Sequence, residues 1–112
     1  MASDKEKQEA SPEVDKKLRD YELVYVVSPE VDEEALESTT GNVNQFITSN
    51  GGIVSEEEKW GKRKLAYPIN RFLEGNYVLT RFKMEPVWSK GLEGSLEISE
   101  DVLRHLLIRV GG

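Results

Sequence analysis

The stretch from Gly61 to Asn70 places the strongest constraint on the fold, because it reads Gly-Lys-Arg-Lys-Leu-Ala-Tyr-Pro-Ile-Asn. Its three consecutive cations need water or an anion, whereas the apolar residues that follow need a core. A β-strand satisfies both needs, since successive side chains point to opposite faces. Pro68 has no backbone N–H, so its strand should lie at the edge of a sheet. The stretch therefore predicts a basic, half-exposed edge strand.

Further cations gather around this stretch, although the whole chain carries a formal net charge of -6. Between positions 59 and 83 there are seven cations and one anion, Glu74, so the local net charge is +6. Such a local field can attract phosphate groups even on an acidic protein. The alternative is that the lysines only prevent the edge strand from pairing with other chains. The seven cations are Lys59, Lys62, Arg63, Lys64, Arg71, Arg81 and Lys83.

Four extended segments are expected. Residues 19–28 are rich in β-branched and aromatic residues, which predicts a central strand covered on both sides for much of its length. Residues 53–70 predict a long strand that bends near Trp60 and Gly61. Residues 77–84 predict a strand in which the even-numbered and odd-numbered side chains occupy opposite faces. Residues 102–110 predict the last strand.

Two helices and one turn complete the pattern. Residues 32–50 predict a helix that Asp32 caps and that the glycines at 51 and 52 end. Residues 72–76 predict a turn. Pro86 suits the first position of a second helix, which Gly91 and Gly94 weaken. The residues expected on one apolar stripe of this helix are Val87, Trp88, Leu92 and Leu96.

The resulting order, βαββαβ, predicts an α+β fold of the ferredoxin-like type, with a four-stranded antiparallel sheet and two helices on one face. In this arrangement the first and third strands are central, and the second and fourth lie at the edges. The edge is where Pro68 needs its strand to be. We expect residues 1–18, which are mostly polar, to be a disordered tail, and residues 19–112 to form one domain.

Composition excludes several classes of function. The chain has no cysteine, which excludes a disulfide or a thiolate metal site and favours a cytoplasmic protein. Neither a secretory signal nor an apolar run long enough for a membrane span is present. His105 is the only histidine, and no motif pairs it with a nucleophile. We therefore expect no enzymatic activity, cofactor, metal, small-molecule substrate or membrane.

Two other kinds of protein remain possible from the residues. RNA recognition motifs share this order of elements and stack bases on aromatic side chains of the two central strands. Tyr25 and Tyr77 could serve in that way, although the pattern around Gly75 departs from the motif. The terminal glycines at 111 and 112 are also similar to the tail of ubiquitin-like modifiers, whose elements follow a different order.

The residues from Gly61 to Asn70 resemble the signature of the bacterial small-subunit ribosomal protein six family. Other features agree in position over about residues 19–110. They are the Arg-Asp-Tyr-Glu start at Arg19, the Ser-Pro-Glu-Val-Asp helix entry at Ser28, the pair Gly51–Gly52, the Gly-Asn-Tyr run at Gly75, and the closing strand 102–110.

This resemblance implies a ferredoxin-like fold without catalytic activity. It also implies a structural role on the ribosome in the cytoplasm. The protein would bind the central domain of 16S-type rRNA together with ribosomal protein eighteen during assembly and translation. The family pattern suggests six contact residues: Arg19, Tyr21, Lys62, Arg63, Lys64 and Tyr67. The basic cluster adds Arg71, Arg81 and Lys83 as further candidates for binding RNA or the partner.

Overall fold

The computed structural model describes residues 17–111. The predicted tail therefore lies outside the described residues except for its last two positions, 17 and 18. Its disorder stays a prediction.

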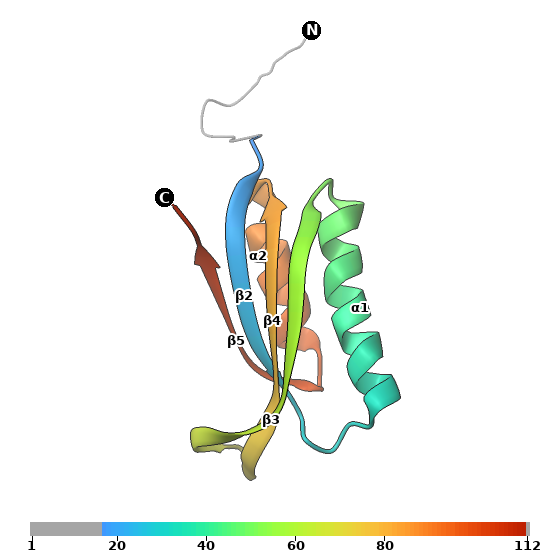
Figure 1. Ribbon diagram of the computed structural model, residues 1–112, viewed down its shortest axis with the longest axis vertical. Coiled ribbons are helices and arrows are strands. Elements are labelled where there is room, and N and C mark those ends of the chain that lie inside the picture. The colour runs from blue at the N-terminus through green and yellow to red at the C-terminus, as the bar shows by residue number, and fades with distance from the viewer. Residues whose placement is uncertain (1–16, 112) are drawn as a thin grey trace, which may run out of the picture.

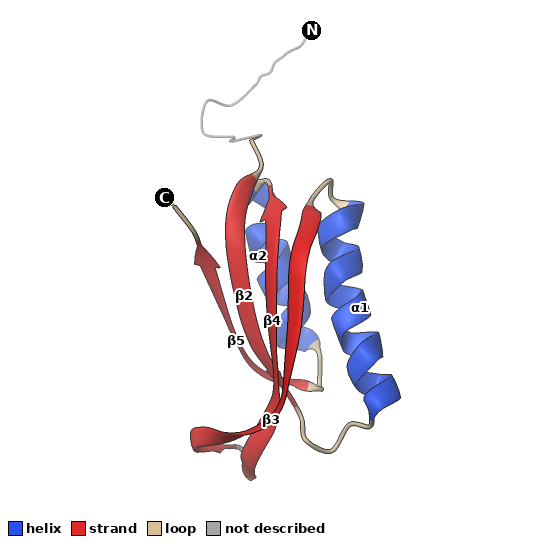
Figure 2. Cartoon of the chain, viewed as in Figure 1, coloured by secondary structure: helices blue, strands red, loops and turns tan. Residues whose placement is uncertain are grey.

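The elements follow the predicted order, with a short 3₁₀ turn before the second helix (Figure 1). They are β2 (Arg19–Val27), α1 (Glu33–Ser49), β3 (Ile53–Ile69), β4 (Phe72–Met84), η1 (Pro86–Trp88), α2 (Ser89–Ile98) and β5 (Val102–Arg109). The four strands form one antiparallel sheet in the order β3-β4-β2-β5. Both helices cover the same face of it (Figure 2). The ferredoxin-like α+β fold is thereby confirmed, with Pro68 in the edge strand β3.

The core fills the space between the sheet and the helices. From β4, alternate residues from Val78 to Met84 enter it, as the sequence predicts. Burying a large aliphatic or aromatic side chain contributes roughly 1.5–3 kcal/mol, so this layer dominates the stability of the fold. The buried apolar residues of the cluster are Tyr21, Leu23, Tyr25, Val27, Val43, Ile47, Val78, Phe82, Met84, Leu92 and Leu96.

Strand β2 corrects one expectation. Its side chains alternate between buried and less buried, so two-sided coverage is limited to Val26 and Val27 at its end. The physical reason is that the helices protect only one face of the sheet. Over Val26 the open face is covered by the far end of β3, where Leu65 and Tyr67 line the same pocket.

Both ends of α1 agree with the expected caps. The Oδ1 atom of Asp32 accepts a hydrogen bond from the backbone N–H of Ala35 at 2.8 Å. At the other end Asn50 is the C-cap, and Gly51 follows it with φ of 83°, a conformation that glycine adopts without steric cost. Both ends of this helix are therefore set by local residues: Asp32 caps its start, and the left-handed Gly51 follows its last turn.

The turn predicted at residues 72–76 is wrong, because β4 already begins at Phe72. The chain reverses at Asn70 and Arg71, with Ile69 opposite Phe72. Asn70 has φ of 57°, and asparagine tolerates this left-handed region better than most residues. Gly75 lies inside β4 instead, where a Cβ atom would collide with the side chain of Val26.

The second helix also differs from its prediction. Leu92 and Leu96 are buried as expected, whereas Val87 and Trp88 are exposed. These two residues belong to the 3₁₀ turn η1, which has about three residues per turn, so the helical spacing does not extend back to them.

Gly52 and Gly41 provide a matched test of the packing between the end of α1 and the sheet. A Cβ atom on Gly52 would lie 2.6 Å from the carbonyl oxygen of Lys83 and 2.7 Å from Cγ2 of Ile47. Gly52→Ala should therefore lower the free energy of unfolding by about 1–3 kcal/mol.

Gly41 is the control, because a Cβ atom there meets nothing within 4 Å. Gly41→Ala should raise the free energy of unfolding by about 0.5–1 kcal/mol, since alanine favours the helix. Urea unfolding of both variants measures the two changes, and equal effects of the same sign would contradict the packing at Gly52.

Candidate functional site

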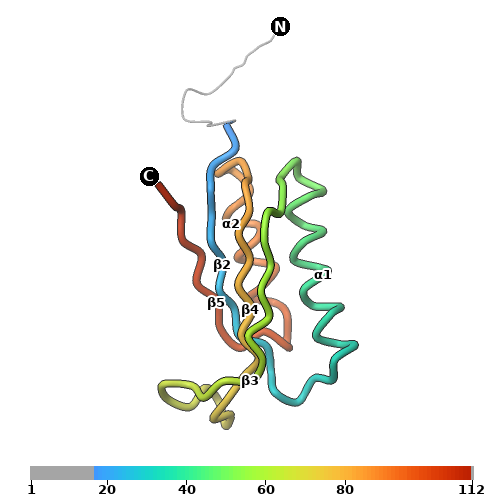
Figure 3. The backbone as a smooth tube through the Cα atoms, in the orientation of Figure 1, coloured from blue at the N-terminus to red at the C-terminus, as the bar shows by residue number. Residues whose placement is uncertain are grey.

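The β3–β4 hairpin extends past the rest of the sheet. Its strands have 17 and 13 residues, whereas β2 and β5 have 9 and 8. The bend predicted near Trp60 is present: Gly61 has φ of 77°, and the strand register shifts between Lys59 and Gly61. Beyond this bulge the hairpin curls toward the side of β5 (Figure 3).

The seven clustered cations do not form one basic patch. Four of them form ion pairs with acidic residues that lie outside the window of positions 59–83. A count along the sequence therefore overestimates the free positive charge, because neighbouring strands and α1 bring in these acids. The simple pairs are Lys59 with Glu37 at 3.5 Å, Arg71 with Glu30 at 3.3 Å, and Lys83 with Asp20 at 3.1 Å.

Arg81 is the most strongly paired of the four. Its Nε atom lies 3.0 Å from Oε2 of Glu22, and one terminal nitrogen lies 2.6 Å from Oε1 of Glu56. The same nitrogen lies 3.7 Å from Oε2 of Glu58. Hydrogen bonds to Glu22 and Glu56 raise the pKa of the guanidinium. With three carboxylates around one cation, this part of the open face is acidic.

Lys62, Arg63 and Lys64 remain together in the far part of the hairpin, and all three are exposed. Over residues 17–111, Lys62 and Lys64 form no ion pair, and Nε of Arg63 donates to the carbonyl oxygen of Trp60 at 3.2 Å. Glu74 is the anion that faces them in the hairpin register. These three side chains, the hairpin cations, are the part of the predicted basic patch that can meet an anion.

Two candidates from the start of β2 lie far from the hairpin cations. Tyr21 is buried, and its ring stacks on Phe82 with centroids 5.6 Å apart. Its side chain is part of the core, and its assignment as a contact residue stays a prediction. Arg19 is half-buried and pairs in register with Met84, at the end of the sheet away from the hairpin tip.

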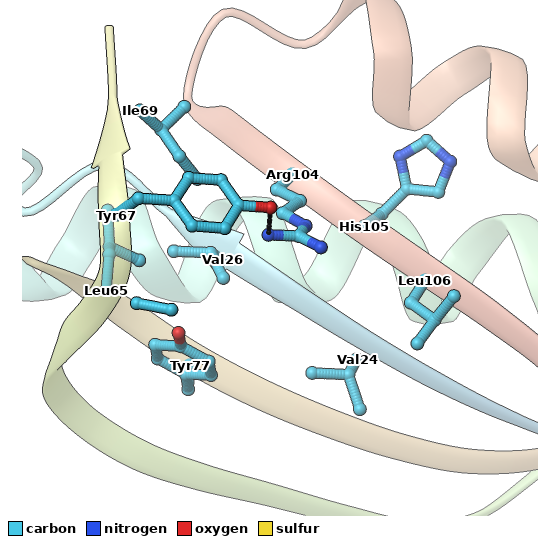
Figure 4. Close-up of a pocket in the computed structure, with 10 residues that line it drawn as sticks. Val24, Val26, Leu65, Tyr67, Ile69, Tyr77, Arg104, His105 and Leu106 are labelled. Atoms are coloured by element: carbon cyan, nitrogen blue, oxygen red, sulfur yellow. Dashed lines mark hydrogen bonds between the residues drawn. The ribbon is translucent and has the colours of Figure 1, made fainter.

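Tyr67 reaches across the open face to β5. An N–H of Arg104 donates to its hydroxyl at 3.2 Å, and the guanidinium carbon lies 5.7 Å from its ring centroid (Figure 4). Both residues line a pocket of about 250 Å³. Arg104 is not among the residues predicted from the sequence, although the alternating burial along β5 places its side chain on the open face.

Trp60 lies at the base of the hairpin. Its ring stacks on Tyr77, with centroids 6.4 Å apart and an angle of 14° between the planes. The indole N–H donates to Oε1 of Glu58 at 2.8 Å. This hydrogen bond is the largest cause that lowers the pKa of the Glu58 carboxyl group.

His105 makes an ordinary structural contact with the second helix. Its Nε2 atom lies 3.6 Å from Oε2 of Glu93 on α2, and it is half-buried on the helix-covered side. Within the described chain no three His, Cys, Asp or Glu side chains gather in a way that could hold a metal ion. None of the helices over residues 17–111 combines the length and apolar character needed to cross a bilayer.

The central strands do not offer stacking aromatics of the RNA-recognition type. Tyr25 is fully buried beneath the helices. Tyr77 already stacks on Trp60. An RNA-recognition module that uses these two tyrosines is therefore not supported by their positions.

The fold and the site define a small α+β binding domain of the ferredoxin-like type, with an open sheet face and a basic hairpin. The family model described as "Ribosomal protein S6" matches residues 20–109. The chain belongs to the ribosomal protein S6 family, as the resemblance at Gly61–Asn70 predicts. This is a family of structural proteins of the small ribosomal subunit, which act in translation, and not a family of enzymes.

Individual relatives agree with this assignment. The chain is 42% identical over 94 residues to small ribosomal subunit protein bS6 of Desulforamulus reducens, covering 84% of this chain and 99% of that protein. It is 44% identical over 91 residues to small ribosomal subunit protein bS6 of Clostridioides difficile, covering 81% and 98%. The crystal structure of 30S ribosomal protein S6 from Thermotoga maritima matches with a TM-score of 0.79 and 30% identity, covering 83% and 88%.

The hydrogen bond from Trp60 to Glu58 makes a testable electrostatic prediction. Trp60→Phe removes the indole N–H but keeps an aromatic ring to stack on Tyr77. The pKa of Glu58 should therefore rise toward its ordinary value. A depressed folded-state pKa stabilises the protein above the ordinary pKa of glutamate, and this stability is lost as the pH falls through the folded-state value. The variant lacks this contribution above the ordinary pKa of glutamate, so its stability should fall less steeply with acidification and should converge with that of the wild type at low pH.

Carbon-13 NMR titration of the Glu58 carboxyl group measures this shift. Trp88→Phe is the matched control, because Trp88 is 39% exposed and Trp60 38% exposed. A pKa of Glu58 that stays the same in Trp60→Phe would show that the indole does not set it.

Proposed function

We propose that the protein binds the central domain of 16S-type rRNA together with ribosomal protein eighteen, as a constituent of the small subunit in the cytoplasm. Membership of the ribosomal protein S6 family over residues 20–109 is the observation that carries this proposal. The exposed hairpin cations support it, because phosphate contacts come chiefly from such side chains.

The hairpin cations would act by contacting phosphates. Contacts of this kind fix the position and orientation of a protein on RNA, but they do not read its sequence. Arg71, Arg81 and Lys83 contribute less under this proposal, since each is already paired with a carboxylate. Tyr67 acts by fixing Arg104 across the open face rather than by stacking on a base.

A protein partner is needed for strong binding under this proposal. The chain carries a formal net charge of -6, and long-range repulsion from RNA opposes the attraction of three exposed cations. A basic partner would lower this repulsion and add further phosphate contacts. In a gel-shift series with a central-domain rRNA fragment, we expect weak binding alone and strong binding after ribosomal protein eighteen is added.

Replacing the three hairpin cations with glutamine (Lys62→Gln, Arg63→Gln and Lys64→Gln) should weaken RNA binding by the two-protein complex. Each lost phosphate contact should reduce the slope of log K against log salt by about 0.7–0.9, so the slope should become shallower by about 2–3. Filter binding over a range of salt concentrations measures both quantities, and urea unfolding checks that the exposed hairpin variant stays folded.

A second triple variant is the control. It also removes three positive charges, but from ion-paired positions, through Lys59→Gln, Arg71→Gln and Lys83→Gln. Exposed ion pairs contribute only about 0–1 kcal/mol each, so this control also stays folded. Under the proposal its RNA affinity falls much less. Equal losses in both variants would show that total charge, rather than the hairpin, governs binding.

A further inference from the structure

The pocket under the curled hairpin is built from residues of all four strands (Figure 4). Leu65 and Ile69 come from β3, Val24 and Val26 from β2, and Leu106 from β5. These side chains make its walls mainly apolar. An apolar hollow of about 250 Å³ on an otherwise charged face is the kind of place where a partner side chain can be anchored.

Arg104 supplies the only cationic side chain among the pocket's lining residues. Over the described residues it forms no ion pair, unlike Arg71 and Arg81. Its contacts are with Tyr67: one N–H donates to the hydroxyl, and the guanidinium lies over the ring. A guanidinium has five N–H donors, so most of them remain available to a carboxylate. Tyr67 holds this cation at the rim of the pocket.

The pocket favours a protein segment over a nucleobase. Stacking of a base on these rings would compete with contacts that they already make, since the ring of Tyr67 lies against Arg104 and that of Tyr77 stacks on Trp60. The walls are mainly apolar, and the one charged group among them is the guanidinium of Arg104, which suits a single carboxylate. An apolar side chain next to a carboxylate satisfies both the walls and the guanidinium.

We propose that the pocket between the curled hairpin and β5 anchors a segment of the protein partner in which an apolar side chain stands beside a carboxylate. The apolar side chain fills the space between Leu65, Ile69 and Leu106. The carboxylate accepts hydrogen bonds from Arg104. This inference rests on the proposed function for the identity of the partner. It separates the two surfaces, because the hairpin cations bind RNA and the pocket binds protein.

The test is the affinity of the full chain for purified ribosomal protein eighteen, measured by isothermal titration calorimetry without RNA. Arg104→Gln and Leu106→Glu should each weaken the heterodimer by about 10-fold or more, since each removes one half of the anchor. Lys90→Gln and Val87→Glu are the matched controls from the helix-covered side. Leu106 is 57% exposed and Val87 56% exposed, so both glutamates enter at similar surface positions.

Nuclear magnetic resonance locates the contact independently of the substitutions. Addition of the partner to the labelled protein should shift the backbone amides of residues 24–26, 65–69 and 104–106. Shifts at these amides caused by the RNA fragment alone, or by raising the concentration of the protein itself, would assign the pocket to RNA or to a second copy and overturn the proposal.

The outcomes also separate this inference from the proposed function. If the wild-type heterodimer forms but Arg104→Gln and Leu106→Glu bind as tightly as the controls, the pocket proposal fails and the proposed function stands. If wild-type protein does not bind ribosomal protein eighteen, both fail. If the two pocket variants lose the partner while the hairpin triple variant keeps it, the division between the two surfaces is supported.

Discussion

One-sided burial is the constraint on which the rest of the structure depends. Helices α1 and α2 protect a single face of the sheet, and the alternating residues of β2 and β4 supply the core on that side. The opposite face must then tolerate water along its whole length. It does so through ion pairs around Arg81 and Lys83 and through the hairpin that curls over Val26. Every candidate contact surface is a consequence of that open face.

The division of charge follows from the same geometry. Antiparallel pairing places Glu22 and Glu56 on either side of Arg81, so a cation in the middle of the sheet is neutralised by its neighbours. Beyond the end of β2 the only acidic residue opposite the hairpin cations is Glu74, and these cations stay exposed. Strands β3 and β4 are longer than β2 and β5. This difference in length, more than local composition, therefore decides which cations a phosphate can reach.

The fold was largely predictable, because it depends on short-range signals. Asp32 marks a helix start, Gly51 a helix end, and the alternation of residues 77–84 one buried face. The same alternation applied to residues 19–27 places Tyr21 with Leu23 in the core. The turn at Asn70 was harder to predict, since Gly75 offers a stronger turn signal but is needed for close packing against Val26.

The candidate site was less predictable, because pairing across strands cannot be read along the chain. Arg81 and Glu22 are 59 positions apart, and the ion pair between them changes what a local count of charges means. Tyr67 and Arg104 meet only because the hairpin curls. The sequence predicted the three exposed hairpin cations, whereas the pocket proposed for the partner could be found only in the folded chain.

The bulge at Gly61 sets the direction of the hairpin tip through one backbone angle. No neighbouring atom lies within 4 Å of where a Cβ would be, so the requirement for glycine comes from the backbone conformation alone. The direction of the hairpin is therefore controlled by Gly61, whereas its charge is controlled by Lys62, Arg63 and Lys64. Within this family, a chain could redirect its basic tip relative to the sheet without gaining or losing a single cation, and a comparison of charge alone would not detect it.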